Sequence, residues 1–337
     1  MLRFEDIDKD SFDKYVSEKH PEANFLQSSG WANVYEIDGK DTWLKAIKEG
    51  KKILGVSLII LKPARRGRYL EIPGGPLLDW KNRKLIDFFL ESVKEMAKEQ
   101  FCVFVRMRPN IYDTDEREDL MRDLGLVKSP MHLHAEHTVM LDLTKSEEEL
   151  LTDMRRQTRY EVRRAEKLGI TVDWANSEKD FDDFYDIQLK TAERQGFIPS
   201  SREFIQAQRK AFGEKARIYT AKLDGKVLAK GLIIFWHPEA IYHEAASTDA
   251  GRKLPGAYAL QWRIIRDAKE LGLERYNLFG IAPPNSPKHR YAGVTTFKCG
   301  FGGEKVTFLP AYDMPVNKIH YRVVHLLEEI RKKRRHL

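Results

Sequence analysis

Residues 46–61, AIKEGKKILGVSLIIL, and residues 221–235, AKLDGKVLAKGLIIF, share one pattern. Each stretch reads as an apolar strand, a tight turn of an acidic residue, glycine and lysine, and a second apolar strand. A third strand with a loop, a helix-like run and a strand ending at proline follow in both copies. One β-β-β-α-β unit therefore occurs twice, over 46–109 and 221–283, which predicts a duplicated α/β domain. Chance similarity of common hairpins is the alternative, and agreement over four consecutive elements disfavours it.

A charged segment, 144–169, lies between the two copies. Thr144 and Glu147 resemble a helix-capping box, and Gly169 is a natural stop, which predicts one helix. Its apolar face is expected to hold residues at helical spacing: Leu151, Met154, Thr158, Val162, Ala165 and Leu168. Its other face is basic, and three arginines four residues apart form one row: Arg155, Arg159 and Arg163. This row predicts contact with RNA or a phosphate, with an ordinary solvated helix as the alternative.

Length and composition limit the possibilities further. A chain of 337 residues, 42% hydrophobic and 32% charged, predicts about two soluble domains. The net charge of +7 favours a polyanionic partner such as nucleic acid, nucleotides or an anionic membrane surface. Two cysteines exclude a disulfide framework and a four-cysteine metal site. The amino-terminal residues do not resemble a signal peptide and the apolar runs are too short to cross a bilayer, so we expect a cytoplasmic protein.

The basic end of the chain, RKKRRHL, has two interpretations. It is either a solvated helix end or a patch that touches RNA or anionic lipid. Three histidines in MHLHAEHT, at 132, 134 and 137, place His132 and His134 on one face of a strand if the segment is extended. A metal site needs a larger ligand set, so the expectation is no metal.

Two glycine-containing loops could bind a phosphate group. PGGP, 73–76, lies between a strand and a helix, although it fits neither common phosphate-binding motif, which favours a turn. GRKLPGAY, 251–258, resembles the acyl-CoA pyrophosphate loop of GNAT acetyltransferases. Pro255 stands where the first glycine of that loop belongs, and proline has no backbone N–H to donate, which weakens a CoA site.

The stretch TTFKCGFGG, 295–303, holds the best candidate for chemistry. Read as a strand, it puts Lys298 on the face opposite Phe297 and Cys299, so the thiol would not be activated by the lysine. Phe297 and Cys299 are then packing residues, and Lys298 could stabilise an oxyanion if its face lines a cleft. A surface lysine is the alternative. The glycines read as a turn after the strand.

Several segments, taken in order, resemble the FemABX family of aminoacyl-tRNA-dependent transferases, which add amino acids to peptidoglycan precursors. They are FLQSSGWANVYE, EIPGGPLLDW, the run from HTVMLDL to RRAEKLGITV, YHEAAS, YNLFGI and TTFKCGFGG, and they cover nearly the whole chain. The resemblance implies an α/β fold of two tandem GNAT-like domains, which agrees with the internal repeat. No segment matches the helical arm that some members insert, so a compact type is expected. The implied domains are 1–145 plus 311–337, which binds the precursor, and 146–310, on the aminoacyl-tRNA side with the catalytic lysine.

The resemblance also implies roles for single residues. Lys298 and Phe297 map onto the family's catalytic pair, with the lysine stabilising the tetrahedral oxyanion and no cofactor or metal involved. The implied partners are aminoacyl-tRNA and UDP-MurNAc-pentapeptide or lipid II, with a monomeric enzyme and peripheral contact with the inner face of the membrane as further expectations. The acceptor would lie between the domains. Substrate-binding residues are expected to be Gly74, Gly75, Arg194, Tyr242, Glu244, Trp31 and Tyr35, and tRNA or phosphate contacts are expected from Arg155, Arg159 and Arg163.

The chain departs from the family pattern at three places. Tyr35 and Glu36 stand after the opening Trp31 where a lysine can occur, Glu244 replaces a tyrosine, and Asn277 replaces a common aspartate. These departures leave the acceptor open. An acyl-CoA-dependent GNAT N-acyltransferase and a non-catalytic RNA- or envelope-binding protein on the same fold are the alternative functions.

Overall fold

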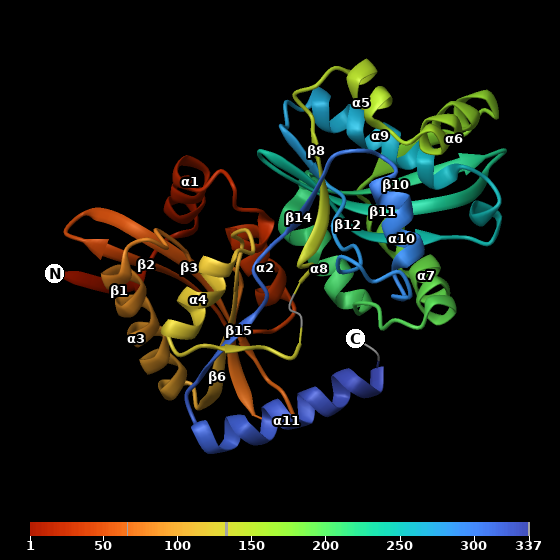
Figure 1. Ribbon diagram of the computed structural model, residues 1–337. Helices are drawn as coiled ribbons and strands as arrows, with labels where there is room; N and C mark the ends of the chain where they lie inside the picture. Colours follow the sequence, from red (N-terminus) through yellow and green to blue (C-terminus); the bar gives the residue numbers. More distant parts are fainter. Residues whose placement is uncertain (66, 132–133, 336–337) are drawn as a thin grey trace. The chain divides into compact units, whose positions relative to one another are not determined.

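The protein folds as two α/β units, each built on one mixed β-sheet (Figure 1). The coordinates are a computed structural model that describes residues 1–65, 67–131 and 134–335. Residues 1–136 and 307–337 form unit 1, and residues 137–306 form unit 2. The carboxyl-terminal segment thus returns to the first unit after the second is complete. Strand β8 (His137–Asp142), which the sequence prediction placed in the first domain, belongs to the sheet of unit 2.

The sheet of unit 1 has the order β1-β2-β3-β4-β6-β15-β7, with β5 paired to β3. Strands β4 and β6 are parallel, and the neighbouring pairs are antiparallel. The strands are β1 (Leu2–Asp6), β2 (Thr42–Glu49), β3 (Lys52–Lys62), β4 (Arg68–Gly74), β5 (Leu77–Leu78), β6 (Cys102–Pro109), β7 (Val127–Lys128) and β15 (Tyr312–Pro315).

Helices cover both faces of this sheet. Helix α3 packs its apolar side on β6 and β1, where Phe89, Val93 and Met107 are buried. Helices α1 and α2 contact β2 and β3, and α11 contacts β6. The helices are α1 (Lys9–Lys19), α2 (Ser29–Ile37), α3 (Arg83–Glu99), α4 (Asp115–Asp123) and α11 (Lys318–Arg335), with a short 3-10 turn, η1 (Phe25–Gln27), before α2.

The sheet of unit 2 has the order β14-β8-β13-β12-β11-β10-β9. Its strands besides β8 are β9 (Thr171–Ala175), β10 (Ala216–Leu223), β11 (Lys226–Trp236), β12 (Glu239–Ser247), β13 (Arg275–Asn277) and β14 (Glu304–Thr307). Helices α6 and α9 pack together, with α9 against β10 and β11, while α7 contacts β12 and α8 contacts β10. The helices are α5 (Glu147–Asp153), α6 (Arg156–Lys167), α7 (Glu178–Gln195), α8 (Arg202–Phe212), α9 (Gly256–Glu270) and α10 (Ala292–Cys299), with 3-10 turns η2 (Gly213–Lys215) and η3 (Ala250–Arg252).

The internal repeat predicted from the sequence is confirmed. The hairpins β2–β3 and β10–β11 are antiparallel, and each carries one register irregularity next to its turn, at Ile47/Lys48 and at Ala221/Lys222. A third strand follows each hairpin, then a crossover helix, α3 or α9, and a strand parallel to the third, β6 or β13. Two copies of one supersecondary unit therefore form the central strands of the two sheets.

The single helix expected over 144–169 is wrong. The segment forms two helices, α5 and α6, because Met154 has extended backbone angles between them. The capping box belongs to Ser146 and Glu149 instead of Thr144 and Glu147, while Thr144 bonds Asp142. The apolar face was predicted correctly in α6, where Thr158, Val162 and Ala165 are buried. The expected strand through His132 and His134 falls partly outside the described residues, and β8 begins only at His137.

Candidate active site

Lys298 lies in the last turn of α10, so the strand predicted for residues 295–299 is wrong. A short apolar run fits a strand or a helix turn equally well by periodicity, and here the helix forms. The consequence for direction is large, because neighbouring helical residues point about 100° apart instead of to opposite faces. Lys298 points inward and is only 9% exposed. Phe297 and the half-buried Cys299 pack against the hydrophobic core of unit 2.

The ammonium group of Lys298 is held by a backbone turn. Its Nζ donates hydrogen bonds to the carbonyl oxygens of Phe279, at 2.6 Å, and Gly280, at 2.9 Å. The same nitrogen lies 5.7 Å from the centre of the Tyr242 ring. Burial lowers the pKa of Lys298 to about 7, with Cys299 acting weakly in the opposite direction. The group is therefore a cation that titrates near neutrality instead of a permanently fixed charge.

The turn that receives Lys298 has an unusual backbone. Phe279 has φ of +52° and Gly280 has φ of +26°, and a positive φ is strained for a residue with a side chain. The Asn277 side chain holds the turn, because its Oδ1 accepts from the Phe279 amide at 2.9 Å. This places two consecutive carbonyl oxygens where Lys298 can reach both.

Asn277 is in turn fixed by two neighbouring strands. Its Oδ1 also accepts from Thr138 Oγ1 of β8, at 2.5 Å, and its Nδ2 donates to Glu239 Oε1 of β12, at 3.0 Å. Glu239 is fully buried, and burial raises its pKa to about 7 although Asn277 and Arg275 oppose the shift. An aspartate at 277 could not donate to Glu239, so the asparagine found here suits its buried partner.

Tyr242 and Glu244, which were both expected to bind substrate, do not share one surface of the sheet. The register of β12 against β11 shifts at this point, since Ile233 pairs with Tyr242 and Leu232 pairs with Glu244. His243 is the extra residue of a β-bulge, and a bulge changes the direction of the side chains that follow it. Tyr242 joins the core that contains Leu260 of α9, whereas Glu244 contacts α7 and α8.

Glu244 forms the centre of a polar cluster that the sequence did not predict. Its carboxylate accepts from Gln188 of α7, from Ser200 Oγ at 3.2 Å and from Gln208 of α8 at 3.4 Å. Both glutamines are buried. Gln188 follows Phe181 and Phe184 on the buried side of α7, so a polar residue at an apolar helical position was the available signal.

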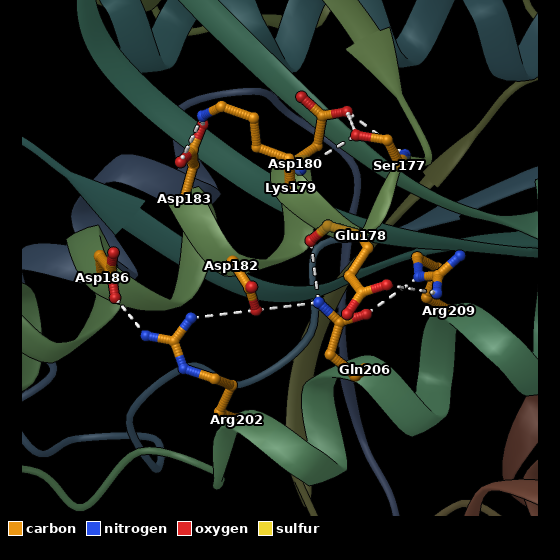
Figure 2. A network of polar contacts seen from close by, with 10 residues as sticks. All are labelled: Ser177, Glu178, Lys179, Asp180, Asp182, Asp183, Asp186, Arg202, Gln206 and Arg209. Carbon is orange, nitrogen blue, oxygen red and sulfur yellow. Dashed lines mark hydrogen bonds and ion pairs between the residues drawn. The ribbon is translucent and has the colours of Figure 1, made fainter.

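The outer surfaces of α7 and α8 are joined by ion pairs that keep this cluster in place. Figure 2 shows Arg202 of α8 reaching Asp182 at 3.0 Å and Asp186 at 2.5 Å on α7. Gln206 adds bonds to Asp182 and to the carbonyl oxygen of Glu178. Exposed pairs are individually weak, but one arginine that pairs with two aspartates on the neighbouring helix links α8 to α7 at two points.

Arg194 and the basic row take positions that partly satisfy their charges. Arg194, near the end of α7, donates to the Ser247 carbonyl at 3.0 Å and pairs with Asp249 at 3.3 Å. Arg159 donates to two carbonyl oxygens at the end of α5. Arg155 and Arg163, four residues before and after Arg159, are exposed. The row therefore offers two exposed guanidinium groups and one that caps a helix.

Trp31 and Tyr35 of α2, which were expected to bind substrate, are core residues in unit 1. Both are buried, and Trp31 packs edge-on against Phe25 with ring centres 4.9 Å apart. Lys62 lies over the Tyr35 ring and donates to its hydroxyl at 3.4 Å. Their burial follows from α2, whose periodicity turns positions 31 and 35 toward β2 and β3 together.

Gly74 and Gly75 end β4 in a turn with a cis peptide before Pro76. The turn lies against Gln27, which is buried and bridges two strands: its Oε1 accepts from the Leu58 amide at 2.9 Å, and its Nε2 donates to the Pro73 carbonyl at 2.7 Å. A Cβ atom on Gly75 would lie 2.7 Å from Gln27 Cδ. The opening FLQS segment and the PGGP turn are therefore one structural unit.

Gly300 in the stretch TTFKCGFGG also permits a close approach. A Cβ atom there would lie 2.3 Å from Thr158 Oγ1 of α6, and its carbonyl accepts from the Arg155 amide at 2.9 Å. The first of these glycines thus joins α10 to α6, in addition to ending the helix. Gly302 and Gly303 follow with positive φ and form the turn into β14.

A groove of about 770 Å³ lies in unit 1 between α3 and α11, and none of the predicted site residues lines it. Leu90, Met314, Tyr321 and Leu326 contribute to its walls. The groove therefore shares no residue with the Lys298 site.

Comparison with known proteins gives the family. The FemAB family model matches residues 7–121, 127–227 and 224–329, which is nearly the whole chain. The chain belongs to the FemAB family. Aminoacyltransferase FemA of Staphylococcus epidermidis is 21% identical over 398 aligned positions, which cover 92% of this chain and 95% of that protein.

Solved structures agree on the fold of this FemAB-family member. The crystal structure of FemX matches with a TM-score of 0.85 and 18% identity, covering 96% of this chain and 100% of that one. A tandem GNAT protein from the clavulanic acid biosynthesis pathway matches with a TM-score of 0.59 and 12% identity, covering 94% and 99%. The prediction of two tandem GNAT-like domains is therefore confirmed.

Replacing Gly75 with alanine should destabilise unit 1 by about 1–3 kcal/mol, since the added methyl group collides with the buried Gln27 side chain. Chemical denaturation measures the change. Gly293→Ala is the matched control, because a Cβ atom there meets nothing within 4 Å and alanine favours its helix. Equal stability of Gly75→Ala and wild type would show that the contact is not needed.

Lys298→Met should change how stability depends on pH. The lysine has a folded-state pKa of about 7 against an ordinary 10.5, so between these values the unfolded chain binds a proton that the folded chain lacks. Rising pH therefore stabilises wild type but not the variant through this group. The unfolding free energy of wild type relative to Lys298→Met should rise by about 3 kcal/mol from about pH 7 to about pH 10. Urea titrations measure it, with exposed Lys305→Met as control; parallel pH curves would contradict the assignment.

Proposed function

We propose that this FemAB-family aminoacyltransferase moves an amino acid from aminoacyl-tRNA to the side-chain amine of a peptidoglycan precursor stem peptide. The acceptor is UDP-MurNAc-pentapeptide or lipid II, and the product serves cell-wall cross-bridge synthesis in the cytoplasm. The supporting observation is the buried Lys298 ammonium on a strained turn. The relative named aminoacyltransferase FemA, which aligns over most of the chain, supports the reaction class.

The reaction needs a place for negative charge to develop. The acceptor amine attacks the ester carbonyl carbon, a C–N bond forms, and the bond to the ribose oxygen of the tRNA breaks. The proton lost by the amine balances the proton gained by that oxygen. A protonated Lys298 carries three N–H groups, of which two bond Phe279 and Gly280, so the third can stabilise the oxyanion of the tetrahedral intermediate. Phe297 fixes the helix end by packing on Tyr258.

The acceptor amine and Lys298 need opposite protonation states for the reaction. The attacking amine must be neutral, whereas a lysine-type amine in water is mostly protonated at neutral pH. Lys298 must be charged to stabilise an oxyanion, and its lowered pKa means that it loses that charge above about pH 7. A rate that rises with pH as the amine is freed and falls as Lys298 deprotonates is the expected profile.

The carboxylate of Glu244 indicates which charge its ligand would carry. A carboxylate in this position attracts an ammonium group and repels a phosphate. Its three donors, Gln188, Ser200 and Gln208, hold it in one orientation. We assign Glu244 to a cationic group of the acceptor substrate other than the attacking amine, with Arg194 and the Gly74–Gly75 turn as further proposed contacts. Trp31 and Tyr35 act by packing.

Two exposed arginines, one just before α6 and one within it, suit the aminoacyl-tRNA donor. Arg155 and Arg163 offer guanidinium groups that can pair with tRNA phosphates, while Arg159 keeps α5 and α6 in register. Binding of this kind weakens steeply with added salt.

Transfer should be observed when the protein is incubated with charged tRNAs and each precursor in turn, and the added residue mass identifies the amino acid. Lys298→Met should lower kcat by about 10²–10³-fold, which is the effect of removing one oxyanion donor. Mass spectrometry of the muropeptide product measures both.

Lys305→Met is the matched control, since Lys305 is exposed on β14 and should leave the rate unchanged. An unchanged rate in Lys298→Met would remove this residue from the mechanism. Transfer from no charged tRNA by the folded protein would refute the proposed function. Salt-sensitive RNA binding in that case would favour the non-catalytic alternative.

Acyl-CoA-dependent transfer is disfavoured by the loop before α9. Pro255 caps this helix without a free N–H, and the Gly256 amide bonds the Leu254 carbonyl at 2.9 Å. The loop also packs tightly on β11, where a Cβ atom on Gly251 would lie 1.9 Å from the Leu228 carbonyl oxygen. The amides of Gly251, Arg252, Lys253 and Gly256 are thus engaged within the protein.

CoA or acetyl-CoA should therefore produce no rise in melting temperature. A ligand present at about 100 times its Kd would stabilise the fold by about 2.7 kcal/mol, which a thermal shift assay detects readily. A clear shift with acetyl-CoA would contradict this expectation and favour the N-acyltransferase.

A further inference from the structure

Helix α11 has one face built into unit 1. Tyr321 and Val324 are buried against Val103 and Phe104 of β6. One turn later, Glu328 accepts a hydrogen bond at 2.7 Å from Arg106, which also pairs with Asp313 of β15. These contacts fix the rotation of the helix about its axis, and therefore also fix which residues face away from the unit.

The face of α11 directed away from β6 carries an exposed aliphatic stripe, and Leu326 of this stripe also lines the groove between α3 and α11. Ile319, Val323, Leu326 and Ile330 follow each other at spacings of four, three and four, so they lie on one side of the helix. Their exposed fractions are 81%, 54%, 61% and 40%. Single exposed aliphatic residues are ordinary, but a continuous stripe of large ones marks a binding surface.

Basic residues border this stripe. At 100° per residue, Lys318 and Arg322 lie on the side of the stripe that lines the groove, where Glu329 also lies, and Arg331 lies on the other side. All three basic residues are exposed. From Lys318 to Arg335 the sequence holds seven Lys or Arg and two Glu, a formal net charge of +5 out of +7 for the whole chain. Glu328, one of the two acids, is already paired with Arg106.

We propose that α11 is a peripheral membrane-binding helix that lies in the surface of an anionic phospholipid bilayer. Its aliphatic stripe enters the boundary between headgroups and acyl chains, and its flanking Lys and Arg bind lipid phosphates, which is the arrangement of helices that lie in a bilayer surface. No helix among the residues described is both long and apolar enough to span a membrane, so α11 would lie on the surface and not cross it. The proposal does not depend on the reaction proposed above.

The chemistry of the stripe separates lipid from other partners. The phosphates of RNA could pair with the basic residues, but the RNA backbone has no apolar surface to contact Ile319, Val323 or Leu326. A second copy of α11 docked on the same stripe would bring the two sets of basic residues together, and like charges oppose such a contact. An anionic bilayer satisfies both the aliphatic and the cationic groups at once.

Vesicle co-sedimentation of the full chain tests the proposal. Wild type should bind vesicles of phosphatidylcholine with phosphatidylglycerol and leave vesicles of phosphatidylcholine alone unbound. Val323→Ser with Leu326→Ser should weaken binding by about tenfold or more, since two buried aliphatic side chains contribute more than one tenfold step in affinity. Arg322→Gln with Arg331→Gln should weaken it too, and added salt should reduce wild-type binding.

The controls separate docking from folding. All the changed side chains are exposed, so the melting temperature of each variant should equal that of wild type. Leu271→Ser, at an exposed leucine of unit 2, should bind vesicles like wild type. Failure of wild type to bind anionic vesicles, or unchanged binding by the Val323 and Leu326 variant, would overturn the proposal. Self-association that the same variant abolishes, without vesicle binding, would overturn it in favour of a second copy.

Discussion

A buried ammonium group that donates its hydrogen bonds to two backbone carbonyl oxygens is the constraint on which the surrounding part of unit 2 depends. Lys298 is removed from water without a carboxylate among its hydrogen-bond acceptors, and a buried charge without a paired countercharge is costly. The structure lowers that cost by directing two carbonyl oxygens at one nitrogen. That geometry needs the positive φ angles at Phe279 and Gly280, and those need the Asn277 side chain. The strands β8, β12 and β13 supply Thr138, Glu239 and Asn277, so the sheet order itself positions the lysine.

The contrast with Arg106 shows that the fold can neutralise a buried cation where charge is not needed. Arg106 has two hydrogen bonds to Asp313, at 2.7 and 2.8 Å, and one to Glu328 at 2.7 Å, and these partners raise its pKa above its ordinary value. Lys298 has its pKa lowered instead. Arg106 is thus paired with carboxylates, whereas Lys298 donates to backbone carbonyls, a difference that fits the role proposed for Lys298.

The sequence predicted the fold well because the repeat is a property of many residues at once. Four consecutive elements of matching length constrain the topology, and both sheets follow it. The predictions of local structure were wrong where the backbone conformation of one or two residues determines the outcome. Residues 295–299 were predicted to be a strand because a run of five residues fits the periodicity of a strand and of a helix equally well. The helix break at Met154 and the bulge at His243 each depend on the backbone of one residue, which periodicity does not register.

The candidate site was predicted in identity more than in geometry. Lys298 and Phe297 were found through their resemblance to a family pair, whereas the acceptors of Lys298 were not, since the carbonyls of Phe279 and Gly280 carry no side-chain signature. For the same reason the sequence did not show that Gln27, Trp31 and the PGGP turn take part in packing. A motif that recurs across a family can be shared for packing as readily as for binding, and the sequence does not distinguish the two. Here Gln27 joins β3, β4 and the turn through both ends of one buried amide, so in this chain these motif residues contribute to packing.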